Sequence, residues 1–86
     1  MLRYTVLVYE DPEEHSFGVV VPELPGCVTQ AESFDQALAN AREAIEGHLL
    51  AMSEHGEEIP EEFGVPIMAT IEVDPDLSAT HTNARW

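Results

Sequence analysis

The chain has 86 residues, the size of one small domain, and 44% of them are hydrophobic, so we expect it to fold around a single modest core. Its 17 Asp and Glu against 3 Lys and Arg give a formal net charge of -14, which disfavours contact with nucleic-acid phosphates and anionic membranes and favours basic partners. The single cysteine, Cys27, excludes an intramolecular disulfide and a CxxC motif. Neither a signal peptide nor a membrane span is predicted, so we expect a cytoplasmic protein.

The first part of the chain predicts a β-hairpin. Residues 2–9 are apolar or β-branched on both alternating faces, which is typical of a strand inside a sheet. Residues 17–21 are β-branched again, and the polar residues 10–15 between them contain a proline. The two runs are therefore expected to pair through an acidic loop.

A tight turn and a third strand follow. Pro25 presets φ for the second position of a type II turn, and Gly26 accepts the positive φ that this turn requires at its third position. Residues 27–31 then alternate as a short strand.

The next segment predicts one long helix. Ser33 is placed as its N-cap, with Gln36 completing a capping box. Gly56 is a plausible C-terminal stop, and Gly47 inside the helix is expected to permit a close backbone approach. The residues of the apolar stripe recur at spacings of three and four: Phe34, Ala37, Leu38, Ala41, Ala44, Ile45, His48, Leu49 and Met52.

The rest of the chain predicts an acidic connector over residues 57–64 and a fourth strand over 65–73. We therefore expect an α+β domain over residues 1–74, with a two-layer βββαβ arrangement, and a flexible C-terminal tail over 75–86. A right-handed crossover would place the fourth strand beside the first, giving a four-stranded mixed sheet of order 3-2-1-4 covered on one face by one helix. Because the other face would stay uncovered, a homo-oligomer, either a dimer or a tetramer, is expected.

Two stretches carry a family resemblance. Residues 22–30, PELPGCVTQ, and residues 33–45, SFDQALANAREAI, resemble the characteristic pattern of the HicB-type antitoxins, apart from Ala31, where that family usually has glycine. The resemblance implies a partial ribonuclease-H-like fold and the binding of a HicA-like toxin, a small basic ribonuclease that cleaves mRNA. Only 13 residues follow Val73, so the chain resembles the stand-alone domain without the DNA-binding part of longer members.

No catalytic, cofactor or metal site is predicted, and we expect a protein that is not an enzyme. His48 and His55 lie two helical turns apart but lack an HxxxH or HExxH spacing, so metal binding is disfavoured. Cys27 is interpreted as a buried packing residue. The expected first strand, up to Tyr9, contains none of the carboxylates that a ribonuclease-H-like metal site needs.

The function predicted is that of an antitoxin-like binding protein, which neutralises a basic HicA-like toxin by covering its RNA-binding surface and does not itself bind nucleic acid. The alternative is a homo-oligomeric HicB-like scaffold or a small-ligand-binding module without a toxin partner. The predicted partner contacts are four acidic residues of the first loop and two residues of the proline-rich turn that the turn geometry does not require: Glu10, Asp11, Glu13, Glu14, Glu23 and Leu24.

Overall fold

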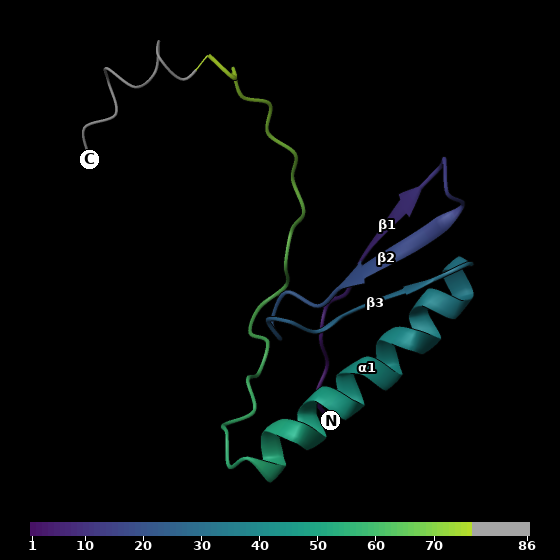
Figure 1. Cartoon of the computed structure of the whole chain (residues 1–86). Helices are drawn as coiled ribbons and strands as arrows, with labels where there is room; N and C mark the ends of the chain where they lie inside the picture. Colours follow the sequence, from purple (N-terminus) through teal and green to yellow (C-terminus); the bar gives the residue numbers. More distant parts are fainter. Residues whose placement is uncertain (77–86) are drawn as a thin grey trace, which may run out of the picture.

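The computed structural model describes residues 1–76, which form a three-stranded antiparallel sheet and one long helix (Figure 1). The strands β1 (Leu7–Asp11), β2 (Ser16–Val20) and β3 (Val28–Ala31) follow one another as a meander in the order β1-β2-β3. The helix α1 (Phe34–Glu54) comes directly after β3 and lies along one face of the sheet. The result is a two-layer arrangement with one open sheet face.

The strand register determines which side chains meet the helix. Val8 pairs with Val19, which pairs with Thr29, and this row lies on the face that α1 covers. Leu7 pairs with Val20 one position away and therefore points to the other face. Alternation thus divides the sheet into a covered face and a helix-free face.

The core between sheet and helix is built from small side chains in two clusters. One cluster contains Val19, Ala31, Ala37 and Ala41, and the other contains Val21, Leu24 and Cys27. Ala37 and Ala41 of α1 are 0% and 3% exposed, so the helix packs close to the strands. Larger side chains at the rim complete the packing: Tyr4, Val6, Val8, Phe17, Ile45, Leu49 and Met52.

The connection from β2 to β3 is a hydrogen-bonded turn that turns Leu24 inward. Cys27 N donates to Leu24 O at 2.9 Å across Pro25 and Gly26, and Gly26 has φ 87°. Only a residue that tolerates positive φ fits that position. Val21 N donates to Cys27 O at 3.1 Å and closes the loop.

Both ends of α1 are capped. The Ser33 Oγ accepts from Gln36 N at 3.1 Å, while the Gln36 side chain accepts from Glu32 N at 3.4 Å. At the other end, Glu57 N donates to Met52 O at 2.9 Å, which together with φ 71° at Gly56 forms a Schellman motif. The helix bounds therefore follow from its capping residues.

The prediction of a four-stranded mixed sheet of order 3-2-1-4 is wrong. Within the described residues, 65–73 belong to no sheet, and the three strands present are all antiparallel. Gly64 has φ 76° and turns the chain, and Pro66 has no N–H to donate to a neighbouring strand. The segment consequently leaves the sheet instead of running along β1, as the green trace in Figure 1 shows.

Three smaller expectations also need correction or fall outside the structure. β1 begins at Leu7 and ends at Asp11, so Glu10 and Asp11 are strand residues and not loop residues. A Cβ added at Gly47 would meet nothing within 4 Å, so this glycine serves no close backbone approach. Nearly all of the predicted flexible tail, residues 77–86, lies outside the described part of the chain.

Candidate partner-binding surface

One end of the sheet gathers acidic side chains from three elements. The β1–β2 hairpin loop lies at this end, and the pairing of Phe17 with Ala31 places the end of β3 beside it. α1 begins three residues after β3 and so starts at the same end. We name this surface the acidic end and define it by six carboxylates: Glu10, Asp11, Glu13, Glu14, Glu32 and Asp35.

The hairpin loop is held by its own first carboxylate. Asp11 Oδ1 accepts from Glu13 N at 3.0 Å and from Glu14 N at 3.3 Å, which is the arrangement of an Asx turn. His15 completes the reversal with φ 54°, a left-handed conformation that is uncommon outside glycine. With the loop backbone ordered in this way, the side chains of Glu13 and Glu14 remain exposed.

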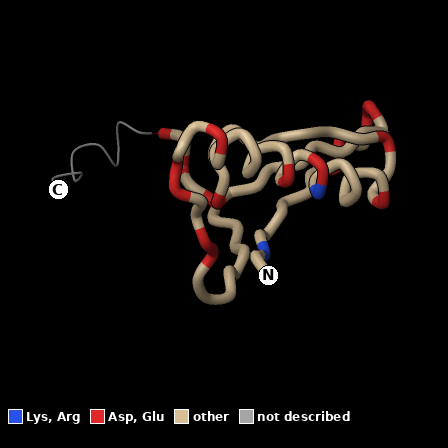
Figure 2. Tube along the Cα trace, turned by 90° about the horizontal axis from the view of Figure 1, so that it is seen from below, with Lys and Arg blue, Asp and Glu red and all other residues tan. Residues whose placement is uncertain are grey.

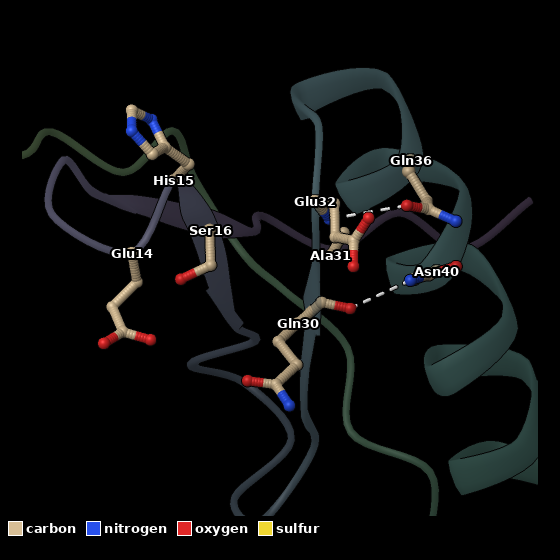
Figure 3. Close-up of a pocket in the computed structure, with 8 residues that line it drawn as sticks. All are labelled: Glu14, His15, Ser16, Gln30, Ala31, Glu32, Gln36 and Asn40. Atoms are coloured by element: carbon tan, nitrogen blue, oxygen red, sulfur yellow. Dashed lines mark hydrogen bonds between the residues drawn. The ribbon is translucent and has the colours of Figure 1, made fainter.

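An open polar hollow of about 900 Å³ lies within the acidic end. Figure 3 shows the side chains of the hairpin on one side of it and those of α1 on the other, with the end of β3 between them. Asn40 Nδ2 donates to Gln30 O at 2.9 Å and ties the helix to β3 at its floor. The Glu14 and Glu32 carboxylates line the hollow, so it suits a cationic side chain.

The charges of the whole molecule are unevenly spread. All 17 carboxylates lie in residues 1–76, and Figure 2 shows most of them toward the two ends of the molecule, with a few along the middle. Arg3 and Arg42 are the only cationic Lys or Arg side chains of the described residues. The second acidic group follows the C-terminus of α1, about 30 Å from the first at 1.5 Å per helical residue.

The structure brings together four of the six predicted partner contacts. Glu10, Asp11, Glu13 and Glu14 share the acidic end, whereas Glu23 lies in the β2–β3 turn at the opposite end of the sheet. Leu24 is 1% exposed and belongs to the core, so its side chain is not on the surface. The six residues therefore do not form one continuous patch.

Two members of the acidic end, Glu32 and Asp35, were not among the predicted contacts. They are separated from the hairpin loop by about twenty residues of sequence, and only the pairing of β2 with β3 places them beside it. The meander topology, once inferred, could have indicated them, because the end of the third strand returns to the first hairpin.

The side chains considered for chemistry lie apart from one another. Cys27 is 4% exposed, and burial raises the pKa of its thiol, which disfavours the reactive thiolate. His55 Nδ1 lies 2.7 Å from Ala51 O on its own helix. Among residues 1–76, no group of three or more His, Cys, Asp or Glu is arranged to hold a metal ion.

The chain can be assigned to a family on both sequence and structure. The family model described as the HicB-like antitoxin of bacterial toxin-antitoxin systems matches residues 4–81. The chain belongs to this family. The resemblance carried by the LPGC turn and the capped helix is thereby confirmed, and the family implies an antitoxin role in general.

Individual relatives agree with this HicB-like assignment. The crystal structure of the N-terminal domain of the Burkholderia pseudomallei antitoxin HicB matches with a TM-score of 0.58 and 34% identity, over 92% of this chain and 82% of that one. A UPF0150 protein of Thermoplasma acidophilum is 41% identical over 59 residues, which are 69% of this chain and 84% of the relative. Another, from Archaeoglobus fulgidus, is 46% identical over 48 residues, 56% of this chain and 68% of the relative. Within the described residues of this HicB-like chain, no helix is long and apolar enough to cross a membrane.

Proposed function

We propose that this HicB-like chain neutralises a small basic HicA-like toxin by laying its acidic end over the surface with which the toxin holds RNA. The observation that carries the proposal is that six carboxylates, from β1, the hairpin loop, the end of β3 and the start of α1, share one end of the sheet, where Glu14 and Glu32 line an open hollow. A surface that binds RNA phosphates presents Lys and Arg side chains. Exposed carboxylates can form ion pairs with those side chains in place of RNA phosphates.

The acidic end acts chiefly on the rate of association. The net charge of -14 and the near absence of cations create a field that attracts a basic protein over a distance of about one Debye length, ~8 Å at physiological salt. Exposed ion pairs themselves add little free energy, about 0 to 1 kcal/mol each. Apolar contacts around the acidic end must then keep the complex together.

The role proposed is binding without catalysis and without direct contact to nucleic acid. Glu10 and Asp11 do stand on β1, where a ribonuclease-H-like fold places a metal-binding carboxylate, but the side chains around them form a solvated surface and not a converging ligand set. Arg3 and Arg42 are too few to neutralise a run of phosphates. The lone buried cysteine and the family favour the cytoplasm as the place where the complex forms.

A kinetic experiment with matched charge variants tests the proposal. The acidic-end variant carries Glu10→Gln, Asp11→Asn, Glu13→Gln and Glu14→Gln, in which the amide oxygen of Asn can still accept the loop hydrogen bonds. Its control removes the same charge from the other acidic group: Glu54→Gln, Glu57→Gln, Glu58→Gln and Glu61→Gln. Association with a purified basic HicA-like protein from the same organism is followed by stopped-flow fluorescence between about 50 and 500 mM salt, a range that spans weak to strong screening.

The acidic-end variant should associate at least tenfold more slowly at low salt and with a flatter salt dependence, while the control should stay within about threefold of the parent chain. RNA cleavage by the toxin should be blocked by the parent and the control at lower concentrations than by the variant. Equal slowing in both variants would show that only net charge matters. That result would contradict a binding site at the acidic end.

The alternative, a homo-oligomeric scaffold or ligand-binding module without a toxin, is favoured by a different observation. Several large apolar side chains of residues 63–73 are more than three quarters exposed, which is typical of an assembly surface. We propose that self-assembly accompanies the antitoxin role. Failure of every basic HicA-like protein of the organism to bind, with self-assembly intact, would favour the scaffold.

A further inference from the structure

The segment 65–73 has the pattern of a strand but lies against nothing that covers it. Val65, Ile67, Ile71 and Val73 share one face of an extended chain, and with Met68 they are 77 to 91% exposed. Within residues 1–76 the segment joins no sheet. An extended apolar run with free backbone groups is the element that adds to the edge of another sheet.

The start of this segment is tied to the body of the molecule. Thr5 N donates to Glu62 Oε1 at 2.7 Å, and the Thr5 hydroxyl donates to Glu62 Oε2 at 2.6 Å. Just before these residues in both segments, the Tyr4 hydroxyl donates to Pro60 O at 2.5 Å. These bonds position residues 60–62 beside the residues that lead into β1.

After this attachment the chain is directed away from its own sheet. Gly64 turns it with φ 76°, and Pro66 has no N–H with which to continue pairing along β1. The nine residues from Val65 to Val73 can span about 30 Å at 3.3 Å per residue, and within this copy they pair with no strand. The segment 65–73 therefore has the pattern of a strand but does not pair with the β1 edge of its own copy.

The body presents a matching surface. Leu7, Val20 and Val28 form one row across the three strands on the helix-free face, and Val28 is 62% exposed. Beside the row, β1 pairs only with β2 among the described residues, so its outer edge is open. An open hollow of about 470 Å³ continues this surface from Leu7 and Pro22 to Phe63 and Ile67.

The charge distribution indicates which partner binds the segment and the Leu7 row. The stretch 63–71, FGVPIMATI, contains no charged residue, and neither does the Leu7 row. A basic partner gains nothing electrostatic here and is drawn to the acidic end instead. Two copies with a net charge of -14 each, in contrast, can approach only through surfaces poor in carboxylates, and these two surfaces meet that condition.

We infer that two copies of this chain exchange residues 65–73, so that each segment adds as a strand to the β1 edge of the other copy and extends its helix-free row with apolar side chains. The exchange is reciprocal, so the same two surfaces are used twice and the assembly closes as a two-fold dimer. The inference deepens the self-assembly part of the proposed function. It leaves the hairpin loop, with Glu13 and Glu14, and the start of α1 outside the exchanged edge.

Sedimentation velocity with matched variants tests the exchange. The segment variant is Ile67→Asn with Ile71→Asn, and its control, Phe34→Asn with Leu50→Asn, changes two exposed apolar residues of α1. At about 50 μM the parent and the control should sediment as dimers and the segment variant as a monomer, with the helical circular dichroism of all three equal. A monomeric parent at 200 μM, or a segment variant as dimeric as the parent, would overturn the inference.

Hydrogen exchange provides a second test, which reports on the segment itself. In the dimer, the amides of residues 67–73 should exchange at least tenfold more slowly than in the monomeric variant, together with the outward-facing amides of β1. A dimer whose residues 67–73 exchange as an unstructured chain would assemble through another face and would contradict the exchange.

The stopped-flow assay separates this inference from toxin binding. The segment variant should keep the salt-dependent association of the parent with the basic HicA-like protein, and the acidic-end variant should keep the dimer. Loss of the dimer in the acidic-end variant would show that the surfaces are not separate and would count against the exchange as described.

Discussion

The sheet–helix body, residues 7–54, and the segment 65–73 carry similar aliphatic side chains but place them in opposite environments. In the body, Val19, Val21 and Leu24 are at most 2% exposed, because α1 lies over them. In the segment, Ile67 and Ile71 are 91% and 81% exposed. The difference teaches that burial here depends on having a covering element within the same copy, and only the body has one.

The core of the sheet–helix body is small. Its buried residues are valines, alanines, one leucine and one cysteine, and the larger side chains lie at its rim. A chain of this size buries little apolar surface by itself, so the strand exchange proposed above would add to its stability. Four measurements sharpen this contrast.

The largest effect is expected at Leu24. Leu24→Ala leaves a cavity in the cluster with Val21 and Cys27, and should lower the free energy of unfolding by about 2 to 4 kcal/mol. The loss should be independent of protein concentration because the site lies inside one copy. Ile71→Ala should instead have an effect that grows with protein concentration. Urea unfolding at 2 and 100 μM measures both, and a concentration-independent cost at Ile71 would place that residue in the body's core.

A medium effect is expected at the start of α1. Ser33→Ala removes the acceptor for Gln36 N and should lower the free energy of unfolding by about 1 kcal/mol. Ser33→Thr is the control, because its hydroxyl can still cap the helix. Thermal and urea unfolding report the change, and equal stability of the two variants would show that the cap contributes nothing measurable.

A smaller change of opposite sign is expected in the middle of α1. Gly47→Ala adds a methyl group that meets nothing within 4 Å and removes the backbone entropy of a helical glycine. The free energy of unfolding should rise by about 0.5 to 1 kcal/mol. A decrease would reveal a close neighbour at Gly47, such as a second copy packed on α1.

The smallest effect is local and depends on pH. The hydrogen bonds from the Thr5 hydroxyl and amide hold the pKa of Glu62 below its ordinary value, and Arg3 acts in the same direction. Because the folded pKa is the lower one, this attachment is complete above the ordinary glutamate value of about 4.3 and is lost as pH falls through the folded pKa. The Thr5 amide resonance, followed by NMR from pH 6 to 2.5, should therefore shift with a midpoint below about 4.3.

A conservative variant checks this assignment. Thr5→Val removes the hydroxyl donor but keeps the amide donor, so the pKa of Glu62 should move back toward its ordinary value. An unchanged midpoint in Thr5→Val would mean that the hydroxyl bond does not stabilise the ionised form.

Local residue chemistry predicted much of the body. Ser33 marked the start of α1, Gly56 its end, and Pro25 with Gly26 the turn before β3, because each position requires a backbone geometry or hydrogen bond that few residues supply. The order of the first three strands also followed, since short connections favour neighbours in a meander. Burial of Cys27 agreed with its reading as a packing residue.

The same reasoning failed where Gly64 and Pro66 together redirect the chain. Residues 65–73 have the alternation of a strand, and that pattern alone predicted a place beside β1. Gly64 and Pro66 directly precede and interrupt it, and their combined effect on direction depends on where Glu62 is held by Thr5, 57 residues away along the chain. The Gly47 prediction failed for a related reason. The local sequence does not show whether another element approaches a glycine inside a helix, and in the structure none does.

The sequence by itself determined the family, the acidity and the local elements, because motifs, charges and caps are properties of neighbouring residues. Only the tertiary structure decided which residues share a surface. Glu32 and Asp35 join Glu13 and Glu14 because β3 returns to the first hairpin, whereas Glu23 is carried to the opposite end and Leu24 into the core. Antiparallel pairing brings together residues far apart in the chain, and no local pattern encodes that distance.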